Sequence, residues 1–365
     1  MFNESTIKLL VINLGSTSTK IAVYENEQEI HRITLNHVAE DLQQFGNVWD
    51  QYGFRRQLIT DWIQEQGYRW EDFKAIVSRG GIMQAITSGV YRVNWQMMVD
   101  IKSGQSGQHA CNIGCQICYD LSCELGILPI TVDPPATNET LRIAAYSGIP
   151  EIWRSARFHL LNQKATARKL ATELNKDYEN LKIVVVHLGG GISIAAHHKG
   201  KVVDVNNALD GDGPFSPERA GGLPAGDLIR LCFSGRFSEA ELLKRVNGQG
   251  GLMAYLGSTD GLEIEKRIKE GDDRAEEVIE AMAFQIAKEI GAAATTLRGD
   301  VEAILLTGGL ANWSRLVSLI KERVSFLAPI YVRPGENELE ALALGALRCL
   351  RGKEPLREYP GVTTA

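Results

Sequence analysis

Residues 8–25 read KLLVINLGSTSTKIAVYE, and residues 182–197 read KIVVVHLGGGISIAAH. In each stretch, an apolar run leads to one polar residue, then to leucine, glycine and small residues, and a second apolar run follows. This pattern predicts two strands joined by a tight glycine turn. Glycine lets the backbone approach a ligand closely, and the amides of such a turn carry positive partial charge that suits phosphate oxygens. Two copies therefore predict a bilobal protein that holds a polyphosphate.

The composition is that of a globular protein with two domains. The chain has 365 residues, of which 44% are hydrophobic and 23% charged, and its formal net charge is −6. At roughly 100–200 residues per domain, this length suits two domains with cores of their own. A net negative chain has no basic field to favour nucleic acid or an anionic membrane. The apolar runs are shorter than the ~20 residues that span a bilayer, and the N-terminal run lacks signal-peptide features, so we expect a cytoplasmic protein.

Apolar periodicity and turn residues predict the same order of elements in both halves of the chain. Strands are expected at 8–14, 19–24, 28–35, 74–78, 127–132, 182–187, 192–197, 201–205 and 302–307. Helices are expected at 40–66, 107–126, 159–175, 238–247, 272–298 and 338–350, and a long loop at 211–227. This order indicates a duplicated α/β unit. We place an N-terminal lobe at 1–155 and a C-terminal, nucleotide-binding lobe at 156–337, with a helix at 338–352 that could return to the first lobe.

Three of the six cysteines are closely spaced. Cys111, Cys115 and Cys118 have the C-x3-C-x2-C spacing of an iron–sulfur loop, and Cys123 follows. The same spacing is one face of a helix, and free cysteine is often buried. We favour a core helix, because the iron–sulfur loop normally follows the first strand of a barrel and the first strand here leads into a phosphate hairpin.

Five runs of residues resemble motifs of the acetate and butyrate kinase family, and they occur in the order of that family. VINLGSTSTK at 11–20 is similar to its opening hairpin, V-I-N-x-G-S-x-S-x-K, and HLGGG at 187–191 to its second hairpin, H-L-G-x-G. AILLTGG at 303–309 is similar to its adenosine motif. VSRGG at 77–81 and VDPP at 132–135 are most similar to the butyrate kinase branch. The resemblance covers nearly the whole chain.

The resemblance implies a fold and a reaction. The fold is that of actin, Hsp70 and the sugar kinases, in which actin-like or ribonuclease H-like βββαβα units form two lobes around a nucleotide cleft. The reaction is ATP plus butanoate giving ADP plus butanoyl phosphate, with Mg²⁺, by direct in-line transfer to a carboxylate. A kinase for acetate, propionate or a branched short-chain acid is the alternative, because one methylene is worth only about 1–3 kcal/mol. Relatives in the family are dimers or larger, so a homo-oligomer is expected.

The resemblance assigns the nucleotide to the two hairpins and to the adenosine motif. The expected nucleotide-binding residues are Asn13, Gly15, Ser16, Ser18, Lys20, His187, Gly189, Gly190, Gly191, Asp260, Gly308 and Gly309. Asp260 matches a family aspartate beside adenine, although Gly261 and Leu262 replace the aromatic residue and the arginine that accompany it.

Three residues are expected to be catalytic. Arg79 precedes two glycines, and its planar set of donors matches a carboxylate or a phosphoryl group. His159 is similar to the first histidine of the family run F-H-G-T-S-H, which contacts the phosphoryl group, and a ring N–H there would stabilise oxygen charge. Asp133 ends a strand before two prolines, and the resemblance assigns it, together with Glu338, to Mg²⁺.

The chain departs from the family pattern at three further points. LLNQ at 160–163 stands in place of G-T-S-H, and LPAGD at 223–227 lacks an active-site arginine of the acetate kinases. Arg219 lies near that gap in the sequence and could substitute for it. The family pair E-E-L becomes NEL at 337–339, with Glu336 just before it.

Two other classes of protein share this superfold. A sugar kinase needs an aspartate base to deprotonate a hydroxyl, a role that Asp133 could fill, whereas a carboxylate is already a nucleophile. A nucleotide-driven binding protein needs a polymer contact or an appended peptide-binding domain, and the chain ends shortly after its second unit. We therefore expect an acyl kinase.

Overall fold

The computed structural model describes residues 6–361, the side chains of residues 39 and 40 excepted, and it consists of two compact units. The first unit comprises the chain up to Asn138 together with the segment from Asn337 onward, and the second comprises Glu139–Glu336. The chain thus passes from the first unit to the second after Asn138, whereas the sequence predicts the boundary between the lobes after residue 155. The segment from Asn337 onward, which contains the helix expected at 338–352, belongs to the first unit.

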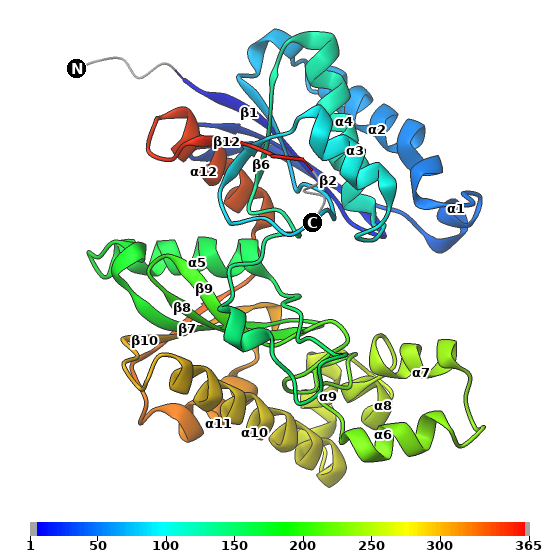
Figure 1. Cartoon of the computed structure of the whole chain (residues 1–365), viewed down its shortest axis with the longest axis vertical. Helices are drawn as coiled ribbons and strands as arrows, with labels where there is room; N and C mark the ends of the chain where they lie inside the picture. The colour runs from blue at the N-terminus through cyan, green and yellow to red at the C-terminus, as the bar shows by residue number, and fades with distance from the viewer. Residues whose placement is uncertain (1–5, 362–365) are drawn as a thin grey trace. The chain divides into compact units, whose positions relative to one another are not determined.

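The first unit contains a seven-stranded sheet with the strand order β12-β5-β6-β4-β1-β2-β3 (Figure 1). Its strands are β1 (Lys8–Leu14), β2 (Ser18–Glu25), β3 (Gln28–Asn36), β4 (Ala75–Ser78), β5 (Val90–Arg92), β6 (Leu128–Val132) and β12 (Leu356–Glu358). Its helices are α1 (Ala39–Gln43), α2 (Tyr52–Glu65), α3 (Trp95–Ser103), α4 (Ala110–Leu125) and α12 (Glu338–Leu350). Helices α4 and α12 pack against the central strands from opposite faces of the sheet (Figure 1).

The second unit contains a five-stranded sheet with the order β11-β10-β7-β8-β9. Its strands are β7 (Lys182–Leu188), β8 (Ile192–His198), β9 (Lys201–Val205), β10 (Ala303–Gly308) and β11 (Ile330–Pro334). Its helices are α5 (Leu160–Glu173), α6 (Ala225–Cys232), α7 (Glu239–Val246), α8 (Gly251–Leu256), α9 (Gly261–Lys269), α10 (Asp273–Thr296) and α11 (Ser314–Val324). Helix α5 covers one face of this sheet, and α10 and α11 cover the other (Figure 1).

The two units repeat one strand arrangement. The order β3-β2-β1-β4-β6 in the first unit matches β9-β8-β7-β10-β11 in the second. The three hairpin strands of each unit are antiparallel: in the first unit β1 pairs with β2 and β2 with β3, and in the second unit β7 pairs with β8 and β8 with β9. The next two pairings in each sheet are parallel: in the first unit β1 pairs with β4 and β4 with β6, and in the second unit β7 pairs with β10 and β10 with β11. The predicted fold class, an α/β protein with a duplicated βββαβα unit, is confirmed.

Alternation along the strands explains the two-sided burial. In β7, Val184 and Val186 join the core with α10 and α11, whereas Ile183 and Val185 join the core with α5. Successive side chains of a strand point to opposite faces, so a strand that is apolar throughout must be covered on both sides. The apolar faces of α10 and α12 are buried in the core.

The cysteine cluster is part of the core of the first unit. Cys111, Cys115 and Cys118 lie on α4 and are at most 4% exposed. Burial raises the pKa of Cys111 to about 11 and that of Cys118 to about 12, which keeps both as thiols. Within residues 6–361 no group of three or more Cys, His, Asp or Glu side chains is placed to hold a metal ion. The prediction of a core helix is confirmed.

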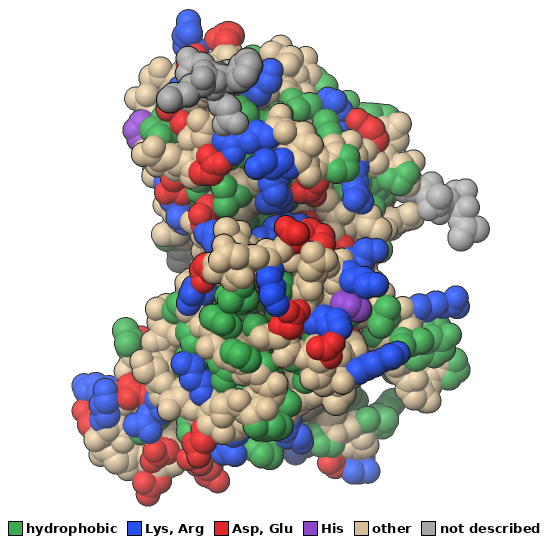
Figure 2. Space-filling model, turned by 90° about the vertical axis from the view of Figure 1, so that its left-hand side faces the viewer, with side chains coloured by type: hydrophobic (Ala, Val, Ile, Leu, Met, Phe, Trp, Pro, Cys, Tyr) green, Lys and Arg blue, Asp and Glu red, His purple; other side chains and the backbone are tan. Residues whose placement is uncertain are grey.

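The exterior carries charges of both signs. Basic and acidic side chains are interspersed over the face shown in Figure 2. Among the described residues, no helix combines the length and the apolar character needed to cross a membrane.

Candidate active site

The tip of the first hairpin, residues 14–18, is a tight turn between β1 and β2. The Gly15 N–H donates to the Ser18 carbonyl at 2.9 Å. Ser16 Oγ lies 3.1 Å from His109 Nε2, and His109 Nδ1 accepts from the Cys111 N–H at the start of α4. Because Nδ1 is an acceptor, the neutral ring carries its proton on Nε2 and donates it to Ser16. Burial lowers the pKa of His109, which favours this neutral form.

Arg55 on α2 fixes the backbone of this tip. Its side chain is fully buried, and its guanidinium donates to the carbonyls of Ser16 and Ser18 at 3.1 and 2.9 Å and to Thr19 Oγ1 at 3.2 Å. Burial lowers the pKa of Arg55, although an arginine stays protonated. Sequence reasoning missed Arg55, because a single arginine in a mixed helical stretch usually lies on the solvent face. Its contacts turn the carbonyls of the hairpin toward α2.

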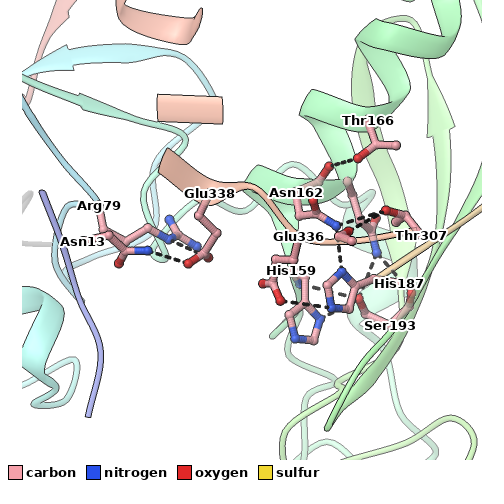
Figure 3. A network of polar contacts seen from close by, with 12 residues as sticks. Asn13, Arg79, His159, Asn162, Thr166, His187, Ser193, Thr307, Glu336 and Glu338 are labelled. Carbon is pink, nitrogen blue, oxygen red and sulfur yellow. Dashed lines mark hydrogen bonds and ion pairs between the residues drawn. The ribbon is translucent and has the colours of Figure 1, made fainter. Parts of the chain in front are cut away.

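Three polar side chains surround Glu338, the first residue of α12, and two of them, Asn13 and Arg79, are drawn in Figure 3. Asn13 Nδ2 donates to Glu338 Oε2 at 2.5 Å, and Arg79 Nε lies 3.3 Å from Oε1. Lys20, which pairs with Asn13 in the register of β1 and β2, adds its charge to the group. Burial by itself would raise the pKa of Glu338, but Arg79, the Asn13 amide and Lys20 outweigh it, so the pKa lies below its ordinary value. Glu338 is therefore an ionised carboxylate beside two cations.

Asp133 stands at the end of β6 in a constrained conformation. Its φ is +41°, a left-handed value that non-glycine residues rarely adopt, and its side chain is 2% exposed. The carboxylate accepts from the Gly89 N–H at 2.9 Å, and the Asp133 N–H donates to the Gly89 carbonyl at 3.0 Å. Arg79 Nη1 donates to the Asp133 carbonyl at 3.2 Å. Arg79 thus links the end of β6 to the start of α12.

The glycines after Arg79 leave room for these contacts. Gly80 has φ +79°, and a Cβ there would lie 2.6 Å from Pro134 Cβ and 2.5 Å from Thr131 Oγ1. Real Cβ atoms do not approach other heavy atoms so closely. The close packing of two loops, those after β4 and after β6, therefore requires glycine at this position.

The tip of the second hairpin lies under the loop 213–222. The turn is closed by the Gly189 N–H, which donates to the Gly191 carbonyl at 3.2 Å. A Cβ at Gly190 would lie 3.0 Å from Glu218 Oε1, and a Cβ at Gly191 would lie 1.7 Å from Arg219 Nη1. The Arg219 guanidinium donates to the Ala208 carbonyl and to Asn247 Oδ1, and burial lowers its pKa. The structure thus brings Arg219, the candidate substitute for the missing family arginine, into contact with the tip of the second hairpin.

His159 and His187 form a stacked pair in the second unit. Their ring centroids are 3.7 Å apart and their planes differ by 9°. His159 is the N-cap residue of α5, and His187 is the last but one residue of β7 and is 1% exposed. His187 Nε2 lies 4.0 Å from Glu336 Oε2 (Figure 3). A Cβ at Gly189 would lie 2.9 Å from His187 Nε2, so this nitrogen faces the glycine turn.

A pocket of about 350 Å³ lies beside the turn after β10. It is lined by residues of α9 and its N-cap, of the turn 309–312 and of the start of α11: Asp260, Gly261, Leu262, Glu265, Lys269, Gly309, Leu310, Asn312, Trp313, Ser314 and Arg315. Asp260 caps α9, because its carboxylate accepts from the Leu262 N–H at 2.8 Å. Trp313, which sequence reasoning missed, forms one wall, and its Nε1 donates to Glu265 at 2.8 Å. The Asp260 and Gly309 predicted for the nucleotide therefore share one pocket.

Gly308 fixes the turn that leads to this pocket. Its φ is +87°, and a Cβ there would lie 2.4 Å from the Leu188 carbonyl oxygen. Its N–H and carbonyl pair with Gly335 at 3.1 and 3.0 Å. A side chain at position 308 would collide with backbone, so only glycine lets β10 end beside the second hairpin.

The predicted residues thus form three groups. Asn13, Lys20, Arg79, Asp133 and Glu338 gather in the first unit around the tip that holds Gly15, Ser16 and Ser18. His159, His187 and the glycines 189–191 gather in the second unit, and Asp260 and Gly309 line its pocket. The sequence missed Asn162, Gln163, Ser193 and Thr307, which support the histidines. For Ser193 and Thr307 the available signal was a polar residue within an apolar strand run, whereas Asn162 and Gln163 lie on a helix of mixed composition.

The chain is similar to known kinases along nearly its whole length. Butyrate kinase 2 and Butyrate kinase 1 of Clostridium acetobutylicum are 47% and 46% identical to it over 352 residues, which is 96% of this chain and 99% of each relative. The solved acetate kinase of Porphyromonas gingivalis shares the fold with a TM-score of 0.76 at 18% identity, covering 94% of this chain and 100% of that one. A family model described as the Acetokinase family matches residues 150–337. The chain therefore belongs to the acetokinase family.

Proposed function

We propose that the protein is a short-chain fatty acid kinase that converts ATP and butanoate into ADP and butanoyl phosphate. The observation that carries this proposal is the 47% identity to a butyrate kinase over 96% of the chain. Kinases for acetate, propionate or a branched short-chain acid remain the alternatives, because a small change in an apolar pocket shifts chain-length preference by only about 1–3 kcal/mol.

The acid needs no general base. A carboxylate is already an anion, so an oxygen lone pair attacks the γ-phosphorus while the bond to the β-phosphate oxygen breaks and ADP leaves. The difficulty is the repulsion between the acid and the nucleotide, which positioned cations relieve. We assign Arg79 to this task, because its guanidinium is held in place by Glu338 and by the Asp133 carbonyl. Its planar donors match the oxygens of a carboxylate or a phosphoryl group.

We assign the stacked histidines to the phosphoryl oxygens. His187 Nε2 faces the glycine turn 189–191, whose backbone amides suit phosphate. Hydrogen-bond donors aimed at oxygens that gain charge in the transition state lower the barrier without moving a proton. Arg219, which rests on Gly191, supplies positive charge to the same turn.

The carboxylates of the first unit fit a magnesium ion. Mg²⁺ is usually held by one or two carboxylates together with substrate phosphates and water. Glu338 is ionised because Arg79, Asn13 and Lys20 lower its pKa, and Asp133 adds a second carboxylate. We propose that these two side chains hold Mg²⁺, which, when bound, neutralises charge on the nucleotide phosphates.

We propose that the 350 Å³ pocket takes the adenosine of ATP. Its lining combines the apolar Leu310 and Trp313 with the polar Asn312 and Asp260, the mixture expected for a nucleobase site. We propose a cytoplasmic location for the protein, because ATP is its proposed substrate. We also propose a homo-oligomer, because apolar side chains such as Ile143, Ile152 and Trp153 are 53–76% exposed on the segment 141–153.

The test is an acyl-phosphate trap. The purified protein is mixed with Mg-ATP, hydroxylamine and one acid from the series acetate to valerate, and the hydroxamate is measured as its coloured iron complex. A signal that peaks at butanoate is the expected result. A peak at another short acid would keep the mechanism and change the substrate. No hydroxamate with any acid, while the protein still binds ATP, would contradict the proposal.

A further inference from the structure

We propose that Gln163 and Ser193, together with Asn162 and Thr307, are positioning residues that hold His159 and His187 as neutral rings with the proton on Nε2. The stacked pair would then present two N–H donors. That these donors act on a phosphoryl group rests on the proposed function, whereas the positions of the ring protons follow from the hydrogen bonds of the second unit alone.

The orientation of the Gln163 amide is fixed by a backbone carbonyl. Gln163 Nε2 lies 3.1 Å from the Ser193 carbonyl oxygen, which can only accept, so the atom facing it must be the amide nitrogen. The same nitrogen lies 2.9 Å from Ser193 Oγ and donates its second hydrogen there. The amide oxygen then faces His197 Nε2 at 3.0 Å, so His197 carries its proton on Nε2.

His197 supports this orientation from the far end. Its Nδ1 accepts from the Tyr178 hydroxyl at 2.8 Å, which leaves Nε2–H to donate to Gln163. The ring is fully buried, and burial, followed by the charges of Lys164 and Arg168, lowers its pKa to about 3. His197 is therefore neutral at working pH and its two nitrogens have distinct, fixed roles.

Ser193 links the Gln163 amide to the His159 ring by hydrogen bonds. Ser193 is fully buried, and its Oγ accepts from Gln163 Nε2 and, at 3.5 Å, from the His159 backbone N–H. Of the partners that the described residues give this hydroxyl, His159 Nδ1, at 3.0 Å, is the one left to accept its proton. A buried hydroxyl that does not donate is costly. His159 Nδ1 is therefore an acceptor, and the ring proton is on Nε2.

Asn162 fixes His187 by the same logic. Thr307 Oγ1 donates to the Gly335 carbonyl at 3.2 Å, so toward Asn162 it acts as an acceptor, and the atom 3.4 Å away is Asn162 Nδ2. The same amide nitrogen lies 2.9 Å from His187 Nδ1 and donates to it (Figure 3). His187 thus carries its proton on Nε2, the nitrogen that faces the glycine turn.

The first turn of α5 explains the LLNQ run that departs from the family motif. His159 is the N-cap, and Asn162 and Gln163 follow three and four residues later, so all three lie on one side of the helix start. Each amide supports one ring of the stack. A neutral ring with its proton on Nε2 still donates a hydrogen bond, so the donor does not require a charged ring. Two imidazolium rings whose centroids are 3.7 Å apart would repel each other.

The direct test is the ¹⁵N spectrum of the wild-type protein labelled on histidine. Protonated and unprotonated ring nitrogens have well separated shifts, and single His→Gln variants assign His159 and His187. At a pH at which both rings are neutral, both are expected to show a protonated Nε2 and an unprotonated Nδ1. A protonated Nδ1 on either ring would overturn the inference. This result does not depend on activity, so it stands apart from any failure of the acyl kinase proposal.

A kinetic test uses Gln163→Glu, which has nearly the same shape but reverses the hydrogen bonding. A carboxylate only accepts, so the Ser193 hydroxyl would donate to it and His159 Nδ1 would have to supply a hydrogen. The expected results are a His159 proton on Nδ1 and a fall in kcat of roughly 100-fold, with the KM for ATP changed by less than about threefold. Wild-type kcat with the proton moved to Nδ1 would contradict the inference.

Tyr178→Phe is the matched control. It removes the hydroxyl that donates to His197 but leaves the Gln163 amide held by the Ser193 carbonyl. We expect a lower melting temperature together with wild-type tautomers and nearly wild-type kcat. A loss of kcat in this variant equal to that of Gln163→Glu, without a change of tautomer, would show that general destabilisation explains both.

Discussion

Arg79 connects three parts of the first unit: the end of β4, the end of β6 and the start of α12. We predict that Arg79→Ala lowers kcat by roughly 100- to 1,000-fold, because a positioned cation at the reacting oxygens is lost. The KM for ATP should change by less than about threefold, since the residues assigned to the nucleotide are intact. Steady-state kinetics with butanoate and Mg-ATP measure both values.

Arg92→Ala is the control for Arg79→Ala. Arg92 lies in the same unit but forms an ion pair with Glu358 on the exterior, with side chains 42% and 58% exposed. Such pairs contribute little to stability. The control should keep wild-type turnover, and wild-type turnover in Arg79→Ala as well would remove Arg79 from the mechanism.

His197 makes stability depend on pH. Burial, with Lys164 and Arg168, holds its pKa at about 3, below the ordinary 6.5. The unfolded chain therefore binds a proton between these values while the folded chain does not, so stability is full above pH 6.5 and falls with pH below it. The expected slope from this group is ~1.4 kcal/mol per pH unit.

Urea unfolding of the wild type and of His197→Gln at pH 7, 6 and 5 measures this slope. The variant should be less stable at pH 7 but should lose less stability on acidification. Parallel curves for the two proteins would show that His197 does not titrate as the structure requires.

At the scale of elements, the second hairpin depends on glycine. We predict that Gly191→Ala lowers kcat by at least about tenfold, because the new Cβ would meet the Arg219 guanidinium at 1.7 Å and the Ala208 carbonyl at 2.9 Å. Gly291→Ala in α10 is the matched control, since a Cβ there meets nothing within 4 Å. The control should keep kcat and gain about 0.5–1 kcal/mol of stability from helix propensity. Unchanged kcat in Gly191→Ala would show that Arg219 and the turn are not coupled to the reaction.

Elements with strong local patterns could be predicted from the sequence. β1 and β7 were predicted at their observed starts, because each is a long apolar run that ends at a glycine turn. β5 and β12 were missed, because each has three residues, too few for a period to appear, and β12 joins the sheet from the far end of the chain. The predicted loop 211–227 includes the first turn of helix α6, because GDGPFSPERAGGLP directly precedes that helix.

At the scale of the whole molecule, the repeat could be predicted, but the residue after which the chain first leaves the N-terminal unit could not. Both hairpins, and hence the duplication, follow from local sequence. The return of the chain at Asn337 is a tertiary event without a linker of distinct composition. Supporting residues such as Arg55 could not be predicted from the sequence for a related reason. Their partners are backbone carbonyls distant in sequence, and sequence periodicity carries no information on them.

In the proposed reaction a carboxylate oxygen of the acid attacks phosphorus, and ³¹P NMR with ¹⁸O-labelled butanoate shows whether this bond forms. The protein is incubated with Mg-ATP and butanoate labelled in both carboxylate oxygens, and the acyl phosphate is observed without a trap. We predict butanoyl phosphate whose ³¹P signal shows the isotope shift of one ¹⁸O bonded to phosphorus. Acyl phosphate without that shift, or no acyl phosphate under conditions where ATP binds, would contradict the account.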